Sequence, residues 1–146
     1  MIALLDVNVL VAIAWPEHTM HSVAVEWFDR RADEGWATCS VTEAGFLRVS
    51  ANPTVVGDPV RPRDAAALLR QLCKVGAHTF LPDDVSPITS ALFARDRLIG
   101  HRQVTDAHLL ALARRHGASL ATFDRGVVTL ARGLQGAVVE VPSGPG

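Results

Sequence analysis

Near its amino terminus the chain reads Ile2-Ala3-Leu4-Leu5-Asp6, a continuous apolar run that ends at an acid. Such a run is typical of a strand buried on both faces of a parallel sheet. Three further short segments, Trp36–Cys39, His78–Leu81 and Ser119–Phe123, also have the character of strands, and we expect a fifth strand at Ala137–Val141. The chain therefore supplies the strands of one central sheet.

The segments between these strands carry the 3.6-residue apolar period of helices, with Gly and Pro at their ends. We expect helices at Val7–Trp15, His21–Glu34, Ser40–Ser50, Arg63–Val75, from Ser86 to about Leu98, and at Val104–His116. Alternating strands and helices predict a three-layer α/β/α domain with a mostly parallel sheet of about five strands. We expect one domain over residues 1–141 and a flexible tail over residues 142–146.

The composition limits the classes of function. A chain of 146 residues has the length of one domain, and 49% hydrophobic residues suffice for a core without structural metal or disulfides. The formal net charge of -1 leaves no strong overall field for nucleic acid, so any such binding depends on local basic patches.

The sequence also indicates where the protein resides. Cys39 and Cys73 have no metal-ligand spacing and are expected to be free thiols in a reducing compartment. The first residues lack a positively charged leader, and no apolar segment is long enough to cross a membrane. We therefore expect a soluble, cytoplasmic protein.

Acidic residues follow three of the predicted strands. Asp6 directly follows the first strand, Glu43 lies just past the second, and Asp124 ends the fourth. Open α/β sheets bind their ligands at the carboxyl ends of the strands. These three carboxylates are therefore expected at one edge of the sheet.

A fourth acid, Asp106, begins a predicted helix instead. Leu109, Leu110 and Ala113 lie three, four and seven positions further on, so Asp106 shares their core-facing stripe. The amino-terminal end of this helix is expected at the same edge of the sheet, because the next strand begins at the other edge. Asp106 should therefore join the other three acids.

Each acid also has a purely structural alternative. Asp6 could cap the first helix, Glu43 could form a capping box with Ser40, Asp106 could complement a helix dipole, and Asp124 could belong to a turn. Each such role stabilises by only about 1 kcal/mol. Like charges about 4 Å apart repel by about 4 kcal/mol at an effective dielectric near 20, so a converging set needs protons or a cation.

Oxygen ligands of this kind suit Mg²⁺ or Mn²⁺, which retain water and can bind phosphate. Such a metal activates water for attack on a phosphodiester. Asn8 and Thr105 neighbour two of the acids and could orient a ligand or water, or could simply satisfy a turn and a helix cap. Arg48, Arg102 and Arg125 lie near the acid-bearing segments and could hold RNA phosphates, with ordinary solvated positions as the alternative.

At these residues the chain resembles a PIN-domain ribonuclease, specifically a VapC-type toxin of a bacterial toxin–antitoxin pair. Leu4–Leu10, Thr42–Arg48, Val104–Ala111 and Leu120–Gly126 resemble the four acidic motifs of the family, and His21–Trp27 resembles a segment of one of its branches. The likeness covers about residues 1–130 in the family's order.

The resemblance implies that Asp6, Glu43, Asp106 and Asp124 hold one or two Mg²⁺ or Mn²⁺ ions. It further implies an endoribonuclease that acts on an RNA such as a tRNA or a ribosomal RNA loop. A homodimer and a VapB-like antitoxin that obstructs the acidic pocket are the expected partners.

Two other functions are weighed against this one. A PIN-like module that binds RNA or a partner without cutting would not need all four acids. A haloacid-dehalogenase-like phosphatase would need an acid where Asn8 stands and a suitably placed lysine. Lys74, the only lysine, precedes the third strand and so lies at the wrong edge.

Overall fold

The computed structural model of the chain describes residues 1–58, 60–90 and 100–145, with only the backbone of Arg102. Within these residues, none of the helices has both the length and the apolar character needed to cross a membrane.

A five-stranded sheet forms the centre of the molecule, in the order β3-β2-β1-β4-β5. The strands are β1 (Ala3–Leu5), β2 (Trp36–Cys39), β3 (His78–Leu81), β4 (Ser119–Ala121) and β5 (Val139–Glu140), and every neighbouring pair is parallel. All five predicted strands are confirmed, although the first and the last two are shorter than expected. Because β1 pairs with β2 on one side and with β4 on the other, the strand order reverses between β1 and β4.

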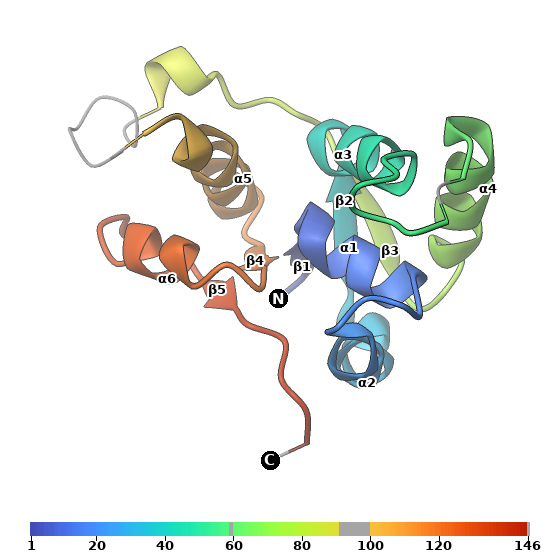
Figure 1. The fold of residues 1–146 in the computed structure, drawn as a ribbon. Coiled ribbons are helices and arrows are strands. Elements are labelled where there is room, and N and C mark those ends of the chain that lie inside the picture. Colours follow the sequence, from blue (N-terminus) through green and yellow to red (C-terminus); the bar gives the residue numbers. More distant parts are fainter. Residues whose placement is uncertain (59, 91–99, 146) are drawn as a thin grey trace.

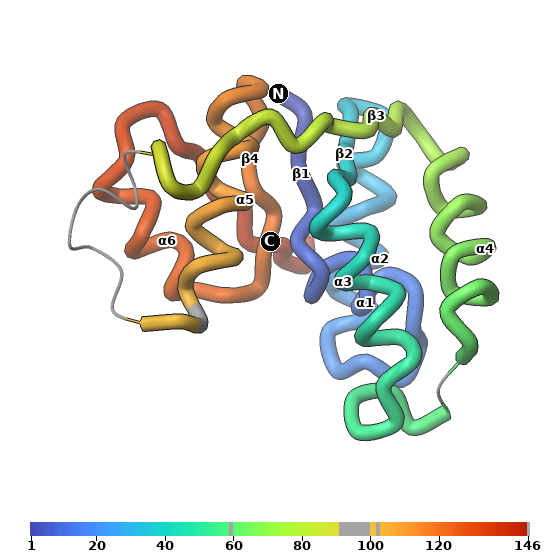
Figure 2. The backbone as a smooth tube through the Cα atoms, turned by 90° about the horizontal axis from the view of Figure 1, so that it is seen from above, coloured from blue at the N-terminus to red at the C-terminus, as the bar shows by residue number. Residues whose placement is uncertain are grey.

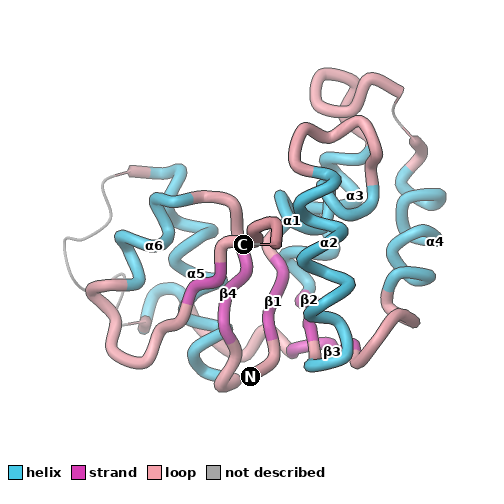
Figure 3. Tube along the Cα trace, turned by 90° about the horizontal axis from the view of Figure 1, so that it is seen from below, coloured by secondary structure: helices cyan, strands magenta, loops and turns pink. Residues whose placement is uncertain are grey.

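Helices lie on both sides of this sheet, as the three-layer prediction required. They are α1 (Val7–Ala14), α2 (His21–Arg31), α3 (Ser40–Ser50), α4 (Pro62–Leu72), α5 (Val104–Arg115) and α6 (Arg125–Ala131). The α5 and α6 helices lie on one side of the strands, and the other four helices lie on the other (Figures 1 and 3).

The buried side chains form two clusters, one on each face of the sheet. Leu5 and Trp36 point into the cluster formed with α1, α2, α3 and α4, while Leu4 and Ala37 point into the one formed with α5 and α6. This alternation along β1 and β2 follows from the two-residue period of a strand. It explains why β1 reads as a continuous apolar run, since both of its faces are covered.

Two segments differ from the sequence-based expectation. The helix expected to begin at Ser86 is only a 3-10 turn at Pro87–Thr89, followed by extended backbone at Ser90, and residues 91–99 of that prediction lie outside the described residues. Ile88 is 92% exposed, so the described part of this segment, residues 87–90, places no large apolar side chain in the core. Conversely, α6 was not expected, because Gly126 and the β-branched residues after it favour helix weakly; buried Val127 and Leu130 stabilise it.

The connection from β3 to α5 crosses over β2 and β1 (Figure 2). Two acids in its described part contact histidines. Asp83 Oδ1 lies 2.8 Å from Nε2 of His108 in α5, and Asp84 Oδ1 lies 2.8 Å from Nε2 of His116, the residue that caps the end of α5. These two contacts hold the first residues of the connection against α5.

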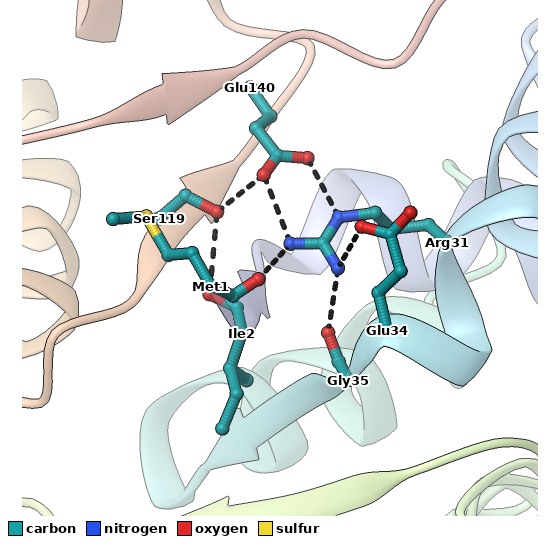
Figure 4. Close-up of polar contacts among 7 residues, drawn as sticks. All are labelled: Met1, Ile2, Arg31, Glu34, Gly35, Ser119 and Glu140. Atoms are coloured by element: carbon teal, nitrogen blue, oxygen red, sulfur yellow. Dashed lines mark hydrogen bonds and ion pairs between the residues drawn. The ribbon is translucent and has the colours of Figure 1, made fainter.

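Arg31 of α2 joins several segments at the amino-terminal edge of the sheet (Figure 4). Its guanidinium is 3.2 Å from each carboxylate oxygen of Glu140 in β5, and it donates to the carbonyls of Gly35 and Met1. The Ser119 hydroxyl of β4 donates to the same Glu140 carboxylate at 2.8 Å. One buried arginine thus connects α2 with the beginnings of β1, β2 and β4 and with the edge strand β5.

Candidate metal centre

Asp6 lies at the carboxyl end of β1, where the strand order reverses between β1 and β4. Its backbone N–H donates to the Ala121 carbonyl at 2.9 Å, which continues the pairing of the two strands. Its Oδ1 accepts from the Val7 N–H at 2.7 Å, so the expected alternative role as a helix cap is present as well. In open α/β sheets this reversal opens the crevice in which ligands bind.

The Thr122 hydroxyl and the Asn8 amide hold Asp6 and the end of β4 together. Thr122 Oγ1 donates to Asp6 Oδ2 at 2.7 Å and accepts from the backbone N–H of Asp124 at 3.1 Å. Asn8 Nδ2 lies 3.3 Å from Asp6 Oδ2 and 3.2 Å from Thr122 Oγ1, and Asn8 Oδ1 accepts from Phe123 N–H at 3.2 Å. Asn8 therefore joins two strand ends rather than closing a local turn.

Thr122 was not singled out from the sequence. Its position two residues before Asp124, on the strand that carries that acid, is the signal that could have identified it. It is fully buried, so its hydroxyl needs partners, and the three hydrogen bonds use its donor and both of its acceptor sites.

Three of the four predicted acids affect one another electrostatically. Burial raises the pKa of Asp6, which is 8% exposed; hydrogen bonds from Thr122 and Val7 oppose this shift, and the charge of Asp124 adds to it. Burial also raises the pKa of Asp106 to about 6, with further contributions from the negative charges of Asp6 and then Asp124. Asp6, Asp106 and Asp124 thus form one acidic group, called here the aspartate cluster.

Among the side chains that the structure describes, no cationic group pairs with the cluster. The ion pairs formed among the described residues involve other acids, none of them in the aspartate cluster. Asp124 is exposed, so the cluster is open to solvent on one side, and its Oδ1 accepts from Gly126 N–H at 2.8 Å as the cap of α6. An open, all-oxygen, uncompensated donor set fits Mg²⁺ or Mn²⁺.

The cluster is not already arranged as a closed ligand cage. Among the residues that the structure describes, no three His, Cys, Asp or Glu side chains are positioned to hold a metal ion together. Mg²⁺ commonly uses only one or two carboxylates and keeps several waters, so an open arrangement is compatible with it.

Glu43 lies in the first turn of α3, but its carboxylate turns toward β2. Its Oε1 accepts from the Thr38 hydroxyl at 2.7 Å. The alternative capping box with Ser40 is wrong, because the cap of α3 is Cys39, whose N–H donates to Thr42 Oγ1 at 3.0 Å. The structure therefore brings together Asp6, Asp106 and Asp124 but directs Glu43 elsewhere.

The weaker predicted positions are scattered. Thr105 is exposed and lies within α5, whose amino-terminal cap is Gln103, so it is not the cap. Arg48 and Arg125 are exposed, on α3 and at the start of α6, while the side chain of Arg102 lies outside the described part of the structure. Their assignment to RNA contacts stays a prediction.

Comparison with known proteins identifies relatives over nearly the whole chain. Residues 3–133 match the PIN domain family. The chain is 54% identical over 130 residues to Ribonuclease VapC38 of Mycobacterium tuberculosis, covering 89% of this chain and 90% of that protein. It is 45% identical over 141 residues to Ribonuclease VapC39 of the same organism, covering 97% and 99% of the two chains.

A solved structure supports the fold independently. The crystal structure of VapBC2 from Rickettsia felis bound to a promoter DNA fragment contains a similar chain, with a TM-score of 0.63, 15% identity, and coverage of 96% of this chain and 98% of that one. At this identity the similarity concerns the fold alone. The family match and the two mycobacterial relatives show that the chain belongs to the PIN domain family and, within it, to the VapC proteins.

Proposed function

We propose that this protein is a divalent-metal-dependent endoribonuclease that acts as the toxin of a VapBC-like toxin–antitoxin pair. The proposal is supported by relatives named as VapC ribonucleases at 54% and 45% identity. The observation that carries it is the aspartate cluster, three carboxylates from β1, α5 and the end of β4 at the strand-order reversal.

In this proposal Asp6 and Asp106 bind Mg²⁺ or Mn²⁺ directly, and Asp124, which is exposed, acts through water. Glu43 is the fourth acid of the site. A bound metal would supply an activated water and stabilise negative charge on the phosphate under attack. The protein's own part is to hold Asp6 in a fixed orientation through Thr122 and Asn8, and to concentrate divalent cations through the negative charge of the three aspartates.

The partners are proposed on the same basis. RNA, such as a tRNA or ribosomal RNA loop, is the substrate, and Arg48, Arg102 and Arg125 are candidates for phosphate contacts. A VapB-like antitoxin, a homodimeric assembly and a cytoplasmic location complete the proposal. A binding module without catalysis remains the competing function, and cleavage itself separates the two.

The test is cleavage of total RNA by the purified protein with Mg²⁺ or Mn²⁺, compared with excess EDTA. Asp6→Asn should abolish cleavage while keeping the cap of α1, because the Asn side-chain oxygen can still accept from Val7. Asp29→Asn, an exposed change on α2, is the matched control and should cleave like the wild type. No cleavage with either metal, or equal cleavage by the Asp6→Asn protein, would contradict the proposal.

A further inference from the structure

The Glu43 carboxylate belongs to a hydrogen-bonded chain that runs through the face of the sheet opposite α5. Thr38 Oγ1 in β2 donates to Glu43 Oε1 at 2.7 Å and lies 2.9 Å from His78 Nε2 in β3. His78 Nε2 is also 3.5 Å from Cys73 Sγ, and the imidazole lies against the Trp36 ring, with centroids 4.5 Å apart. Three side chains, Thr38, Cys73 and Trp36, therefore contact the His78 imidazole, and Thr38 links it to Glu43.

The donors and acceptors of this chain can be assigned. Thr38 has one hydroxyl proton, which it donates to Glu43, so it can only accept from His78. The Nε2 atom of His78 must then carry its proton, which fixes the tautomer of the ring. Burial lowers the pKa of His78, with an opposing contribution from the charge of Glu43, so the ring is neutral near pH 7.

Glu43 is not placed to share a metal ion with the aspartates, since no three His, Cys, Asp or Glu side chains of the described residues are so positioned. The carboxylate charges that raise the pKa of Asp106 are those of Asp6 and Asp124. The charge of Glu43 acts instead on His78 and on Cys73, whose thiol pKa is raised by burial and then by this carboxylate. Glu43 and Cys73 also line one hollow of about 220 Å³ between α3 and α4.

We propose that Thr38 and His78 are positioning residues that hold the Glu43 carboxylate apart from the aspartate cluster, so that Glu43 must leave the Thr38 hydroxyl before all four acids can bind a divalent metal. This inference rests on the proposed function. The Thr38–His78 pair acts as a competitor of the metal for one carboxylate and thereby weakens metal binding.

The direction of the expected effect follows from this competition. The hydrogen bond from Thr38 stabilises the charged Glu43 where it lies, and solvent restores part of that stabilisation when Glu43 is released. Thr38→Val removes the hydroxyl at nearly constant volume. The variant should therefore bind Mn²⁺ about three- to tenfold more tightly than the wild type. A pair that instead oriented Glu43 for binding would give the opposite sign.

Isothermal titration calorimetry with Mn²⁺ alone tests this sign. Wild type, Thr38→Val, Glu43→Gln and the Thr38→Val/Glu43→Gln double variant are compared, and the tightening should vanish when Glu43 is replaced. Thr79→Val, an exposed change on the adjacent strand, is the matched control and should leave Mn²⁺ affinity unchanged. Unchanged or weaker binding by folded Thr38→Val overturns the proposal.

A second measurement uses the wild-type protein, in case Thr38→Val does not fold. Nitrogen-15 NMR of the imidazoles, with His78 assigned from a His78→Gln spectrum, should show the proton on Nε2 and a shift of that resonance when Mg²⁺ is added. A proton on Nδ1, or a resonance that Mg²⁺ leaves in place although calorimetry shows binding, overturns the proposal. If the wild type binds neither metal, the proposed function is contradicted. If the wild type binds metal but the Thr38→Val or NMR result is the contrary one, only the inference about Thr38 and His78 is contradicted.

Discussion

The Thr122 hydroxyl connects Asp6, Asn8 and the backbone of Asp124 through three hydrogen bonds. Two of these partners, the Asp6 carboxylate and the Asn8 amide, are groups that we expect to face the metal or its water. Residues that orient metal ligands typically change metal affinity or activity 10- to 100-fold when replaced, as a general order of magnitude. We therefore expect Thr122 to matter for metal binding although it does not itself bind the metal.

Thr122→Val should lower the rate of RNA cleavage by about 10- to 100-fold and raise the pKa of Asp6 further, because a hydrogen bond that lowers it is lost. Cleavage assays and Mn²⁺ titration measure the effect. Thr129→Val, an exposed change on α6, is the matched control. Cleavage by Thr122→Val at the wild-type rate would show that Asp6 needs no such support.

Asp106 leads to a prediction about pH. Its pKa rises from 3.8 to about 6 in the folded chain, so the protonated form favours folding, and this contribution is complete below about pH 4 and lost as the pH rises through about 6. In EDTA, Asp106→Asn should therefore stabilise the protein at pH 7 by about 1–2 kcal/mol, a value reduced for solvent screening of this half-exposed group.

Urea unfolding at pH 4 and pH 7 in EDTA measures this difference. The variant and the wild type should have nearly equal stability at pH 4 and differ at pH 7. Added Mg²⁺ should stabilise the wild type but not Asp106→Asn. A variant that is less stable than the wild type at pH 7 in EDTA would rule out the expected repulsion.

At the scale of elements, the sequence predicted what local pattern determines. Apolar runs located all five strands, and Gly117, which takes φ +64°, correctly ended α5. The helix α6 was missed because its stability comes from the burial of Val127 and Leu130 rather than from local preference. The helix expected from Ser86 failed at its start for the converse reason, since exposed Ile88 gives it nothing to pack against.

In the candidate site, too, some features follow from the local sequence and others depend on tertiary contacts. Positions after strands and on a helix stripe were enough to bring Asp6, Asp106 and Asp124 together. The direction of the Glu43 side chain was not predictable, because it depends on Thr38 and His78, which approach only when β2 and β3 pair. Side-chain partners across strands require the tertiary structure, whereas strand ends can be read from the chain.

The contact between α3 and α1 depends on one glycine. A Cβ added at Gly45 would lie 2.5 Å from Cγ2 of Val7, a stiff β-branched side chain next to Asp6. Gly45→Ala should therefore destabilise the protein by about 1–3 kcal/mol, although alanine favours helix more than glycine does.

Chemical denaturation measures the change, and the Gly45→Ala/Val7→Ala double variant should recover part of the loss because the added methyl then has room. Gly57→Ala, where an added Cβ meets nothing within 4 Å, is the control. If the Gly45→Ala protein is as stable as the wild type, α1 and α3 can move apart far enough to accommodate the added methyl group without loss of stability.

At the scale of the whole molecule, the two edges of the sheet have different tasks. The carboxyl edge carries the aspartate cluster, which pairs with no cation among the described side chains, while the amino edge is held by Arg31 and Glu140. Breaking one partner of a buried ion pair leaves the other charge unpaired, so Arg31→Met should destabilise by about 2–4 kcal/mol. Cleavage per folded molecule should change little.

Thermal or urea unfolding and cleavage below the unfolding transition separate these two effects. Arg30→Met, which removes an exposed hydrogen bond to the Ser143 carbonyl, is the control and should cost less than about 1 kcal/mol. Equal losses of stability for the two arginines would show that Glu140 finds other partners.

The pairing of β1 with β4 has a consequence for the time at which the site comes into being. Asp6 and Thr122 stand 116 positions apart in the chain, so joining them requires the closure of a very long loop. Contacts of this range form slowly and late in folding. A growing chain carries Asp6 without Thr122 and Asp124, so the acidic site of the proposed function is incomplete until those residues have been made and β4 has paired. In the proposed function, the time that β4 takes to enter the sheet therefore sets the delay between synthesis of the chain and the first cleavage.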